Sequence, residues 1–481
     1  MSEDTIVFNG IDGTTGAYLL PSMPTAKIAA YALGHPLAAA DLEGMRIRAA
    51  QASPFPLMPG ANPNDLAQSG WAIVFPQATA GSPEAARQEA ICEALAPLLK
   101  LRRNQATRNW AQYYREYKGD EGYQLGESKR QYLGRLGAGP GPADPKNVPY
   151  YLLLVGSPEE IPYHVQYQLD VQYAVGRIHF DDIDDYASYA RTVVAAESPE
   201  HAARRQAAFF GVANPNDPAT QASVRKLVTP LANGASQDAV GASWSIRRYL
   251  QDHASKAALV RLMGGADTPS ILFTASHGIG FSSGDSKQCH AQGALVCQDW
   301  GGPTSGYVSA DHYFTGSDIT EDANLRGLIA FHFACYSAGT PSRDEFVLNR
   351  EIAPRPFVAS LPCRMLAHPG GGAQAVIGSV DRTWSSAFVW EAQPGHVTEQ
   401  LGVFEAAVIG LMRGDRVGHA MDSFNMRYAE LSTELTSTID DIRRYGVQYD
   451  DRELARLWLN NNDSRNWVVL GDPAARLNLD A

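Results

Sequence analysis

The sequence is poor in cysteine, and no part of it has the composition of a membrane or secretory segment. Five cysteines are spread over 481 residues, which is too few for a fold held together by disulfides. No apolar run is long enough to cross a bilayer. Residues 1–4 lack the basic and apolar regions that begin a signal peptide. We therefore expect a cytoplasmic protein that folds around an ordinary hydrophobic core.

Positive charge is also scarce. The chain has 40 Lys and Arg residues against 52 Asp and Glu, a formal net charge of −12. Nucleic-acid backbones and anionic lipid surfaces attract basic patches, and no basic run interleaved with aromatic residues offsets the acidic balance. We therefore expect no nucleic-acid partner and no membrane partner.

Several common catalytic and cofactor motifs are missing. There is no G-x-S-x-G, no H-E-x-x-H and no C-x-x-C, which removes the usual serine hydrolases and zinc proteases. The glycines of Gly278–Gly284 have the wrong spacing for a dinucleotide loop, and no Gly-Lys-Ser/Thr follows Gly370–Gly372. We expect neither metal nor cofactor. Whether Cys289 and Cys297 pair across a hairpin is left open.

Two apolar segments each end on a reactive side chain. Ile271–Ala275 is followed by His277, and Ile329–Phe333 is followed by Cys335. Near-continuous apolar runs are typical of parallel strands buried on both faces, and α/β proteins place chemistry at the carboxyl ends of such strands. If the two strands are neighbours, an imidazole and a thiol lie side by side. A thiol beside an imidazole is the smallest set of groups that can form a cysteine nucleophile with its general base.

Each residue also has a structural explanation when it is taken singly. A cysteine on an apolar strand is often a small core residue, and a histidine near a strand end is often only hydrogen bonded. The equivalent positions of His277 and Cys335 on consecutive segments favour a catalytic pair. An ordinary thiol is mostly protonated at neutral pH, so a base is needed to activate it. No carboxylate that orients the imidazole is evident from the sequence.

Five segments resemble motifs of a clan of cysteine peptidases that includes caspases, gingipains, legumains and CHAT proteases, and they follow one another in the order found in the family. The His-Gly and Ala-Cys motifs resemble the whole clan, and the other three are similar to the gingipain-like C25 branch. The segments are Tyr150–Gly156, Tyr173–Ile178, His277-Gly278, Ala334-Cys335 and Val468–Ala474. The similarity extends from about residue 71 to the end of the chain.

The resemblance implies an α/β fold, a caspase-like parallel-sheet sandwich with helices on both faces and two adjacent subdomains. The alternation of strand and helix patterns independently favours the same class. We expect a gingipain-like subdomain over 71–200 and a catalytic subdomain over 201–481. Residues 1–70 form an extension of unclear role, which either wraps the body or meets a partner.

The resemblance further implies a cysteine endopeptidase that acts on a protein or peptide substrate through a dyad of Cys335 and His277. The oxyanion would be held by the backbone N–H groups of Gly278 and Cys335. In the gingipain-like pattern an acidic residue lies at the base of the S1 pocket, and Asp217 is in the matching loop. It would bind Arg or Lys at P1, although it is equally placed to cap the following helix.

The resemblance also implies that three residues after the apolar run 373–380 lie where the clan binds the substrate backbone and forms the S1 wall. They are Arg382, Trp384 and Ser385. Trp384 either stacks on a basic P1 side chain or belongs to the core. Arg382 offers the alternative that P1 is acidic, as in caspases. We expect Arg or Lys at P1 and keep the acidic preference as the alternative.

Peptidases of this clan that act inside cells are typically latent until cleavage or a partner protein activates them, and the polar region 279–325 is a candidate activation segment. Resemblance to bacterial caspase-like proteins suggests a role in bacterial defence, by analogy alone. Two other interpretations are left open. One is a catalytically inactive scaffold or regulatory protein with the same fold, and the other is a peptide ligase that shares the dyad.

Overall fold

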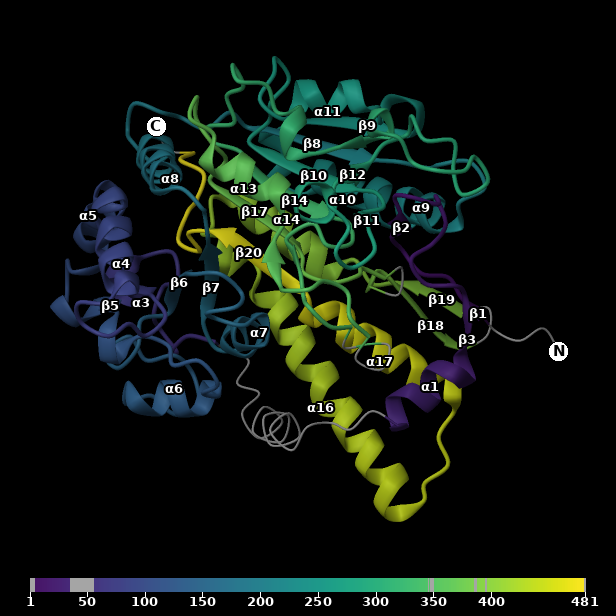
Figure 1. Ribbon diagram of the computed structural model, residues 1–481, viewed down its shortest axis with the longest axis horizontal. Coiled ribbons are helices and arrows are strands. Elements are labelled where there is room, and N and C mark those ends of the chain that lie inside the picture. Colours follow the sequence, from purple (N-terminus) through teal and green to yellow (C-terminus); the bar gives the residue numbers. More distant parts are fainter. Residues whose placement is uncertain are drawn as a thin grey trace.

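A single ten-stranded sheet runs through the protein, with helices on both of its faces (Figure 1). The computed structural model describes residues 5–34, 56–344, 346, 350–384, 387–393 and 396–479. In spatial order the strands are β5 (Tyr114–Tyr117), β4 (Trp71–Val74), β6 (Tyr151–Val155), β7 (Ala174–Ile178), β20 (Trp467–Gly471), β17 (Ala375–Ser379), β14 (Ile329–Phe333), β10 (Ile271–Ala275), β8 (Gln206–Gly211) and β9 (Ser245–Leu250). The expected α/β class is confirmed.

The sheet consists of two parallel halves that meet in an antiparallel pair. All neighbouring strands are parallel except β17 and β20. The expectation of a wholly parallel sheet is therefore wrong at this junction. β20 comes from the end of the chain but pairs with β7, so the two expected subdomains share one continuous sheet. The apolar pattern of a buried strand does not encode its direction, which is why the sequence did not reveal the junction.

The half of the sheet that contains β10 and β14 has mostly apolar side chains on both faces. On β14, Ile329, Phe331 and Phe333 belong to one buried cluster and Ala330 belongs to another. Successive side chains of a strand point to opposite faces, so burial of both faces gives the nearly continuous apolar run seen in the sequence, which only the buried His332 interrupts on β14. The helices that contribute to the first cluster include α10 (Thr229–Gln237) and α14 (Gly402–Arg413). Those that contribute to the second include α11 (Lys256–Leu262) and α13 (Ser360–Ala367).

The described part of the N-terminal extension wraps around the body. Strand β1 (Thr5–Ile6) pairs with β3 (Met23–Pro24), and α1 (Thr25–Gly34) packs on α17 (Asp451–Arg465). Between β1 and β3 the chain leaves this region, and β2 (Ile11–Asp12) forms a parallel pair with β11 (Ile279–Gly280), just beyond the end of β10. Figure 1 shows this excursion in purple, running from α1 toward β11.

The five cysteines are free thiols, so Cys289 and Cys297 do not pair. Across the described ranges, no group of three or more His, Cys, Asp or Glu side chains is placed to hold a metal ion. The described helices also include none long and apolar enough to span a bilayer.

A buried ion network ties the two halves of the chain together. Arg102, on α5 (Ala96–Ala106), is fully buried and donates from Nε to Asp472 Oδ2 over 2.6 Å. Its terminal nitrogens donate to both carboxylate oxygens of Glu197 at 2.7 Å. Trp71 Nε1 donates to the other oxygen of Asp472 at 2.9 Å. Asp472 follows β20, so this network fixes the last strand of the chain beside the first half of the sheet.

We predict that Arg102→Ala lowers the free energy of unfolding by about 3–5 kcal/mol, because two buried carboxylates lose their partner. The matched control is Arg103→Ala, the same substitution one residue further along α5. The Arg103 side chain is 58% exposed in its ion pair with Glu116, and its loss costs about 1 kcal/mol or less. Denaturant unfolding monitored by circular dichroism measures both, and equal effects of the two variants would contradict the prediction.

Candidate active site

His277 and Cys335 lie side by side at the ends of two paired strands. β10 and β14 are parallel with Ala275 opposite Phe333, and each reactive residue comes two positions later. The backbones of the two loops touch, since a Cβ added at Gly278 would lie 1.8 Å from the carbonyl oxygen of Cys335. Only glycine therefore fits at position 278. The sequence prediction that the two strand ends are neighbours is confirmed, and both side chains have 0% exposure.

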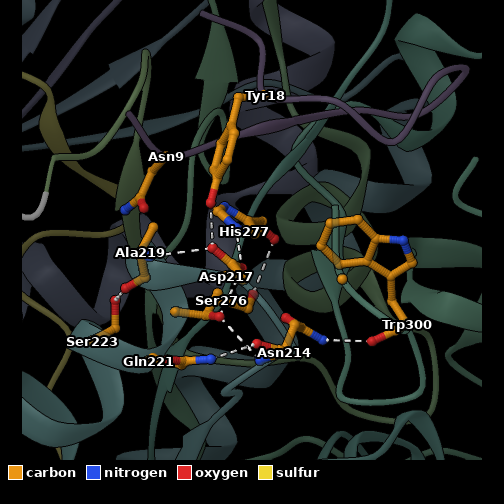
Figure 2. A network of polar contacts seen from close by, with 12 residues as sticks. Asn9, Tyr18, Asn214, Asp217, Ala219, Gln221, Ser223, Ser276, His277 and Trp300 are labelled. Carbon is orange, nitrogen blue, oxygen red and sulfur yellow. Dashed lines mark hydrogen bonds and ion pairs between the residues drawn. The ribbon is translucent and has the colours of Figure 1, made fainter. Parts of the chain in front are cut away.

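Both nitrogens of the His277 ring have defined partners. Nδ1 accepts a hydrogen bond from the Gly10 N–H over 3.1 Å, and Nε2 lies 2.7 Å from Asp217 Oδ2. A nitrogen that accepts carries no proton, so Nε2 is the protonated nitrogen and donates to the carboxylate. Tyr18 and Trp300 flank the ring in edge-on contacts, with centroids 5.7 and 6.2 Å away (Figure 2). The imidazole is thus held with its free nitrogen, Nδ1, facing Gly10.

Asp217 supplies the orienting carboxylate that the sequence did not reveal, so the expectation of a histidine without a carboxylate partner is wrong. Its Oδ2 also accepts from Thr220 Oγ1 at 2.7 Å, and its Oδ1 accepts from Tyr18 OH at 2.6 Å and from Ala219 N at 3.2 Å. Asp217 is the N-cap of α9 (Pro218–Ser223), the alternative left open above. Figure 2 shows the carboxylate of Asp217 together with Tyr18, Ala219 and His277. The hydrogen bond to His277 places this carboxylate against the imidazole instead of in an open S1 pocket.

The surroundings keep Asp217 ionised. Burial favours the neutral acid, but the electrostatic attraction of His277 and the hydrogen bonds from His277, Tyr18 and Thr220 outweigh it, so the pKa of Asp217 lies below its usual range. Burial, together with the charge of Asp217, raises the pKa of Tyr18, whose hydroxyl stays a donor. An ionised carboxylate behind the imidazole stabilises the imidazolium that forms when His277 takes a proton.

Cys335 lies beneath the turn that follows β17. The Thr383 N–H donates to Cys335 Sγ at 3.4 Å, and Thr383 Oγ1 is 3.7 Å from the same sulfur. Burial raises the pKa of the Cys335 thiol to about 11. Tyr336, the next residue, has a φ of 58°, a left-handed conformation that is costly for a residue with a side chain and is concentrated at functional sites.

The predicted oxyanion donors are at the same place. Among the described residues, neither the backbone N–H of Cys335 nor that of Gly278 donates a hydrogen bond to another protein group. Buried N–H groups are rarely left without an acceptor. Their arrangement therefore fits a site in which a substrate oxygen supplies the missing acceptor.

The other predicted S1 residues have partners within the fold. Arg382 donates from a terminal nitrogen to Asp344 Oδ1 at 2.5 Å, and its Nε lies 3.6 Å from Asp381. Trp384 is buried and makes ring contacts with Phe8 and Phe346, each with centroids 4.8 Å away. Ser385 lies outside the described residues.

The protein's own N-terminal segment fills the space between the imidazole and the thiol, which the sequence analysis missed. The Gly10 N–H donates to His277 Nδ1, and a Cβ on Gly10 would lie 3.1 Å from Cys335 Sγ. Asn9 Nδ2 donates to Thr383 Oγ1 at 3.4 Å. The one sequence signal was the set of glycines at 10, 13 and 16, a residue type suited to close backbone approach.

We predict that the N-terminal segment protects Cys335 from alkylation. In the folded protein, iodoacetamide modifies the exposed Cys289 first, and Cys335 reacts faster only as the pH approaches its raised pKa of about 11. We expect Gly10→Ala to loosen the segment, because its Cβ would lie 3.1 Å from Cys335 Sγ, closer than ordinary van der Waals contact, and 2.8 Å from the end of the Leu19 side chain. Labelling of Cys335 near pH 8 then accelerates by about tenfold for each unit by which its pKa falls.

The matched control is Gly126→Ala, which has the same φ of +92° as Gly10 but no atom within 4 Å of the added Cβ. It introduces the same backbone strain away from the site and leaves Cys335 protected. Site-resolved mass spectrometry follows both cysteines. Equal labelling rates for Cys335 and Cys289 in the unmodified protein would contradict the account of a covered thiol.

Comparison with known proteins gives one family and several solved structures. The model of peptidase family C25 matches residues 102–478. Comparison with curated proteins finds no match. The chain is similar to the Arg-specific cysteine proteinase gingipain R (RgpB), with 13% identity, a TM-score of 0.44 and coverage of 85% of this chain and 78% of that one. It is also similar to the complex of Porphyromonas gingivalis RgpB pro- and mature domains, with 14% identity, a TM-score of 0.47 and coverage of 85% and 80%.

Proposed function

Because the chain belongs to peptidase family C25 and is a cysteine-type peptidase, we propose that it cleaves a protein substrate with Cys335 as nucleophile and His277 as base. The observation that carries this proposal is the arrangement around His277. Its Nε2 is bound to an ionised carboxylate, and Nδ1 faces Gly10, where an added Cβ would lie 3.1 Å from the Cys335 sulfur. A base oriented by a third group and aimed at the reacting centre is the signature of nucleophilic catalysis.

The proposed reaction follows the geometry. His277 Nδ1 takes the proton of Cys335, and the thiolate attacks the carbonyl carbon of the substrate. The N–H groups of Gly278 and Cys335 stabilise the oxyanion, and the imidazolium then protonates the leaving amine. Asp217 keeps the proton on Nε2 and lowers the energy of the imidazolium. Water hydrolyses the thioester and restores the thiol.

We further propose that the enzyme is latent while residues 8–13 cross the active site. Cys335 and His277 have no exposed surface with the segment in place. A partner protein or a cleavage event that withdraws the segment would open the site to substrates. The pairing of β2 with β11 places the start of region 279–325 against this segment, which fits the activation role expected for that region. A cytoplasmic location and a role in bacterial defence stay proposals.

Neither charge-based P1 preference keeps the support it had from the sequence. The carboxylate of Asp217, expected to bind Arg or Lys, is hydrogen bonded to His277, Tyr18 and Thr220. The guanidinium of Arg382, the basis of the acidic alternative, is paired with Asp344. Both preferences stay predictions that a panel of peptides tests.

An inactive scaffold is the second candidate, and the complete burial of Cys335 favours it. The two candidates differ in a single property. A latent peptidase gains a reactive thiol and thiol-dependent turnover when the N-terminal segment is displaced, whereas a scaffold gains neither. Gly10→Ala provides the displaced state in which both properties are measured.

We predict that, with the segment displaced, Cys335→Ala and His277→Ala abolish peptide hydrolysis and Asp217→Asn lowers kcat by roughly 100-fold or more with little change in KM. Loss of the carboxylate charge leaves the imidazole poorly oriented and its cation unstabilised. Asparagine still caps a helix, so the fold of Asp217→Asn is kept. Fluorogenic peptides with varied P1 residues measure turnover.

Asp450→Asn is the control, since Asp450 caps α17 through the N–H groups of Arg452 and Glu453 and is remote from the dyad in sequence. It keeps the parent activity. Turnover that persists in Cys335→Ala would assign the activity to another group and overturn the proposed nucleophile.

A further inference from the structure

A polar cleft of about 500 Å³ lies between the first half of the sheet and the C-terminal segment. Its walls come from the residues before α3 (Leu66–Ser69), from α5, and from two arginines late in the chain, Arg416 and Arg476. Arg416 immediately precedes α15 (Val417–Ala420), and Arg476 follows β20. None of the groups assigned to the active site lines this cleft.

The C-terminal wall of the cleft starts at the edge of the sheet opposite to the dyad. Gly471, the last residue of β20, pairs with Ala375 at the start of β17, and Ala375 lies beside Ile329 at the start of β14. Cys335 comes after the other end of β14. A ligand in the cleft would therefore not compete with a peptide bound at the active site.

Arg416 is a buried cation without a carboxylate partner among the described residues. It is 3% exposed, and its guanidinium donates to two backbone oxygens, from Nε to Asn64 at 3.0 Å and from Nη1 to Ala474 at 2.5 Å. Its Nη2 has no partner in the described part of the chain and is not enclosed, so this nitrogen is open to the cleft. Burial lowers the pKa of Arg416 to about 10. A buried charge is costly unless an opposite charge compensates it.

Arg476 brings a second guanidinium to the same cleft. Its side chain forms no hydrogen bond or ion pair within the described ranges, and its charge contributes to the lowered pKa of Arg416. Glu197 attracts Arg416, but both of its carboxylate oxygens already accept from Arg102. Like charges that line one cleft repel each other, and an anion between them would relieve the repulsion.

The other groups on the wall suit an anion with several oxygens. The one carboxylate among the described lining residues, Asp65, is paired with Arg108. Gln105 accepts from Arg102 Nη1 at 2.8 Å through its side-chain oxygen, which leaves its NH2 group to donate to a ligand. Asn104 lines the cleft as an exposed side chain. Guanidinium groups bind carboxylates and phosphates through paired N–H donors.

We propose that this cleft binds a small, doubly charged anion, a phosphate monoester or a dicarboxylate, whose oxygens pair with Arg416 and Arg476. The chemistry that the two ligands share is a pair of negative charges for two guanidiniums that form no ion pair within the described chain. The amides of Asn104 and Gln105 would donate to the remaining oxygens. An anion bound there stabilises the junction between the two halves of the chain, whether or not the protein is a peptidase.

Isothermal titration calorimetry of the full-length chain tests the proposal with glycerol 3-phosphate, succinate and acetate at constant ionic strength. We expect one of the two dianions to bind at a single site per chain and acetate, with one charge, to bind at least about tenfold more weakly. The tighter of the two dianions shows whether a phosphate ester or a dicarboxylate is preferred. The same ligand raises the melting temperature as its concentration rises, because it binds the folded state.

Arg476→Gln is the decisive variant, because this side chain has no contact within the described chain that the fold needs. It weakens binding of the dianion about tenfold or more. The matched control is Arg225→Gln, at an exposed position between α9 and α10, and it binds like the unmodified chain. Equal affinity in Arg476→Gln and the unmodified chain overturns the proposal. Acetate binding as tight as that of the dianions, or no saturable binding of either dianion, also overturns it.

Discussion

The parallel pairing of β10 with β14 is the constraint on which the rest of the active site depends. It sets Ala275 opposite Phe333. His277 and Cys335, each two residues further along, therefore lie next to each other at the carboxyl ends of the two strands. The two loops touch so closely that position 278 admits only glycine. Apolar side chains on both faces hold these strands in place, and the stability of the core therefore fixes the geometry of the chemistry.

Around this pair the protein neutralises its charges and closes the site with its own chain. Asp217 is paired with His277 and Arg382 with Asp344, all with little or no exposed surface. The remaining space is taken by residues 8–13, of which Gly10 contributes a backbone donor to His277 and Asn9 contributes a carboxamide that donates to Thr383. The covering segment accounts for a thiol and an imidazole that have no exposed surface.

The residues that the sequence identified are those whose signal is local. His277 and Cys335 follow apolar strands, and their equivalent placement needed only the rule that parallel neighbours align. Asp217 was noticed, but as an S1 acid or a cap, because its bond to a histidine 60 residues away is purely tertiary. The contact of Gly10 with His277 joins residues that are 267 positions apart, and no periodic pattern in the sequence indicates such a contact. The antiparallel pairing of β17 with β20 was not predicted, because an apolar run indicates a buried strand but not the direction in which that strand runs.

The central proposal is a latent peptidase whose Cys335 and His277 are covered by residues 8–13. The most direct measurement is the thiol-dependent turnover of fluorogenic peptides by Gly10→Ala, compared with the unmodified chain under the same conditions. The account predicts turnover in the variant that exceeds that of the unmodified chain and is lost when Cys335→Ala is added. Equal turnover by the two chains, or no turnover by a variant whose Cys335 has become open to alkylation, would contradict it.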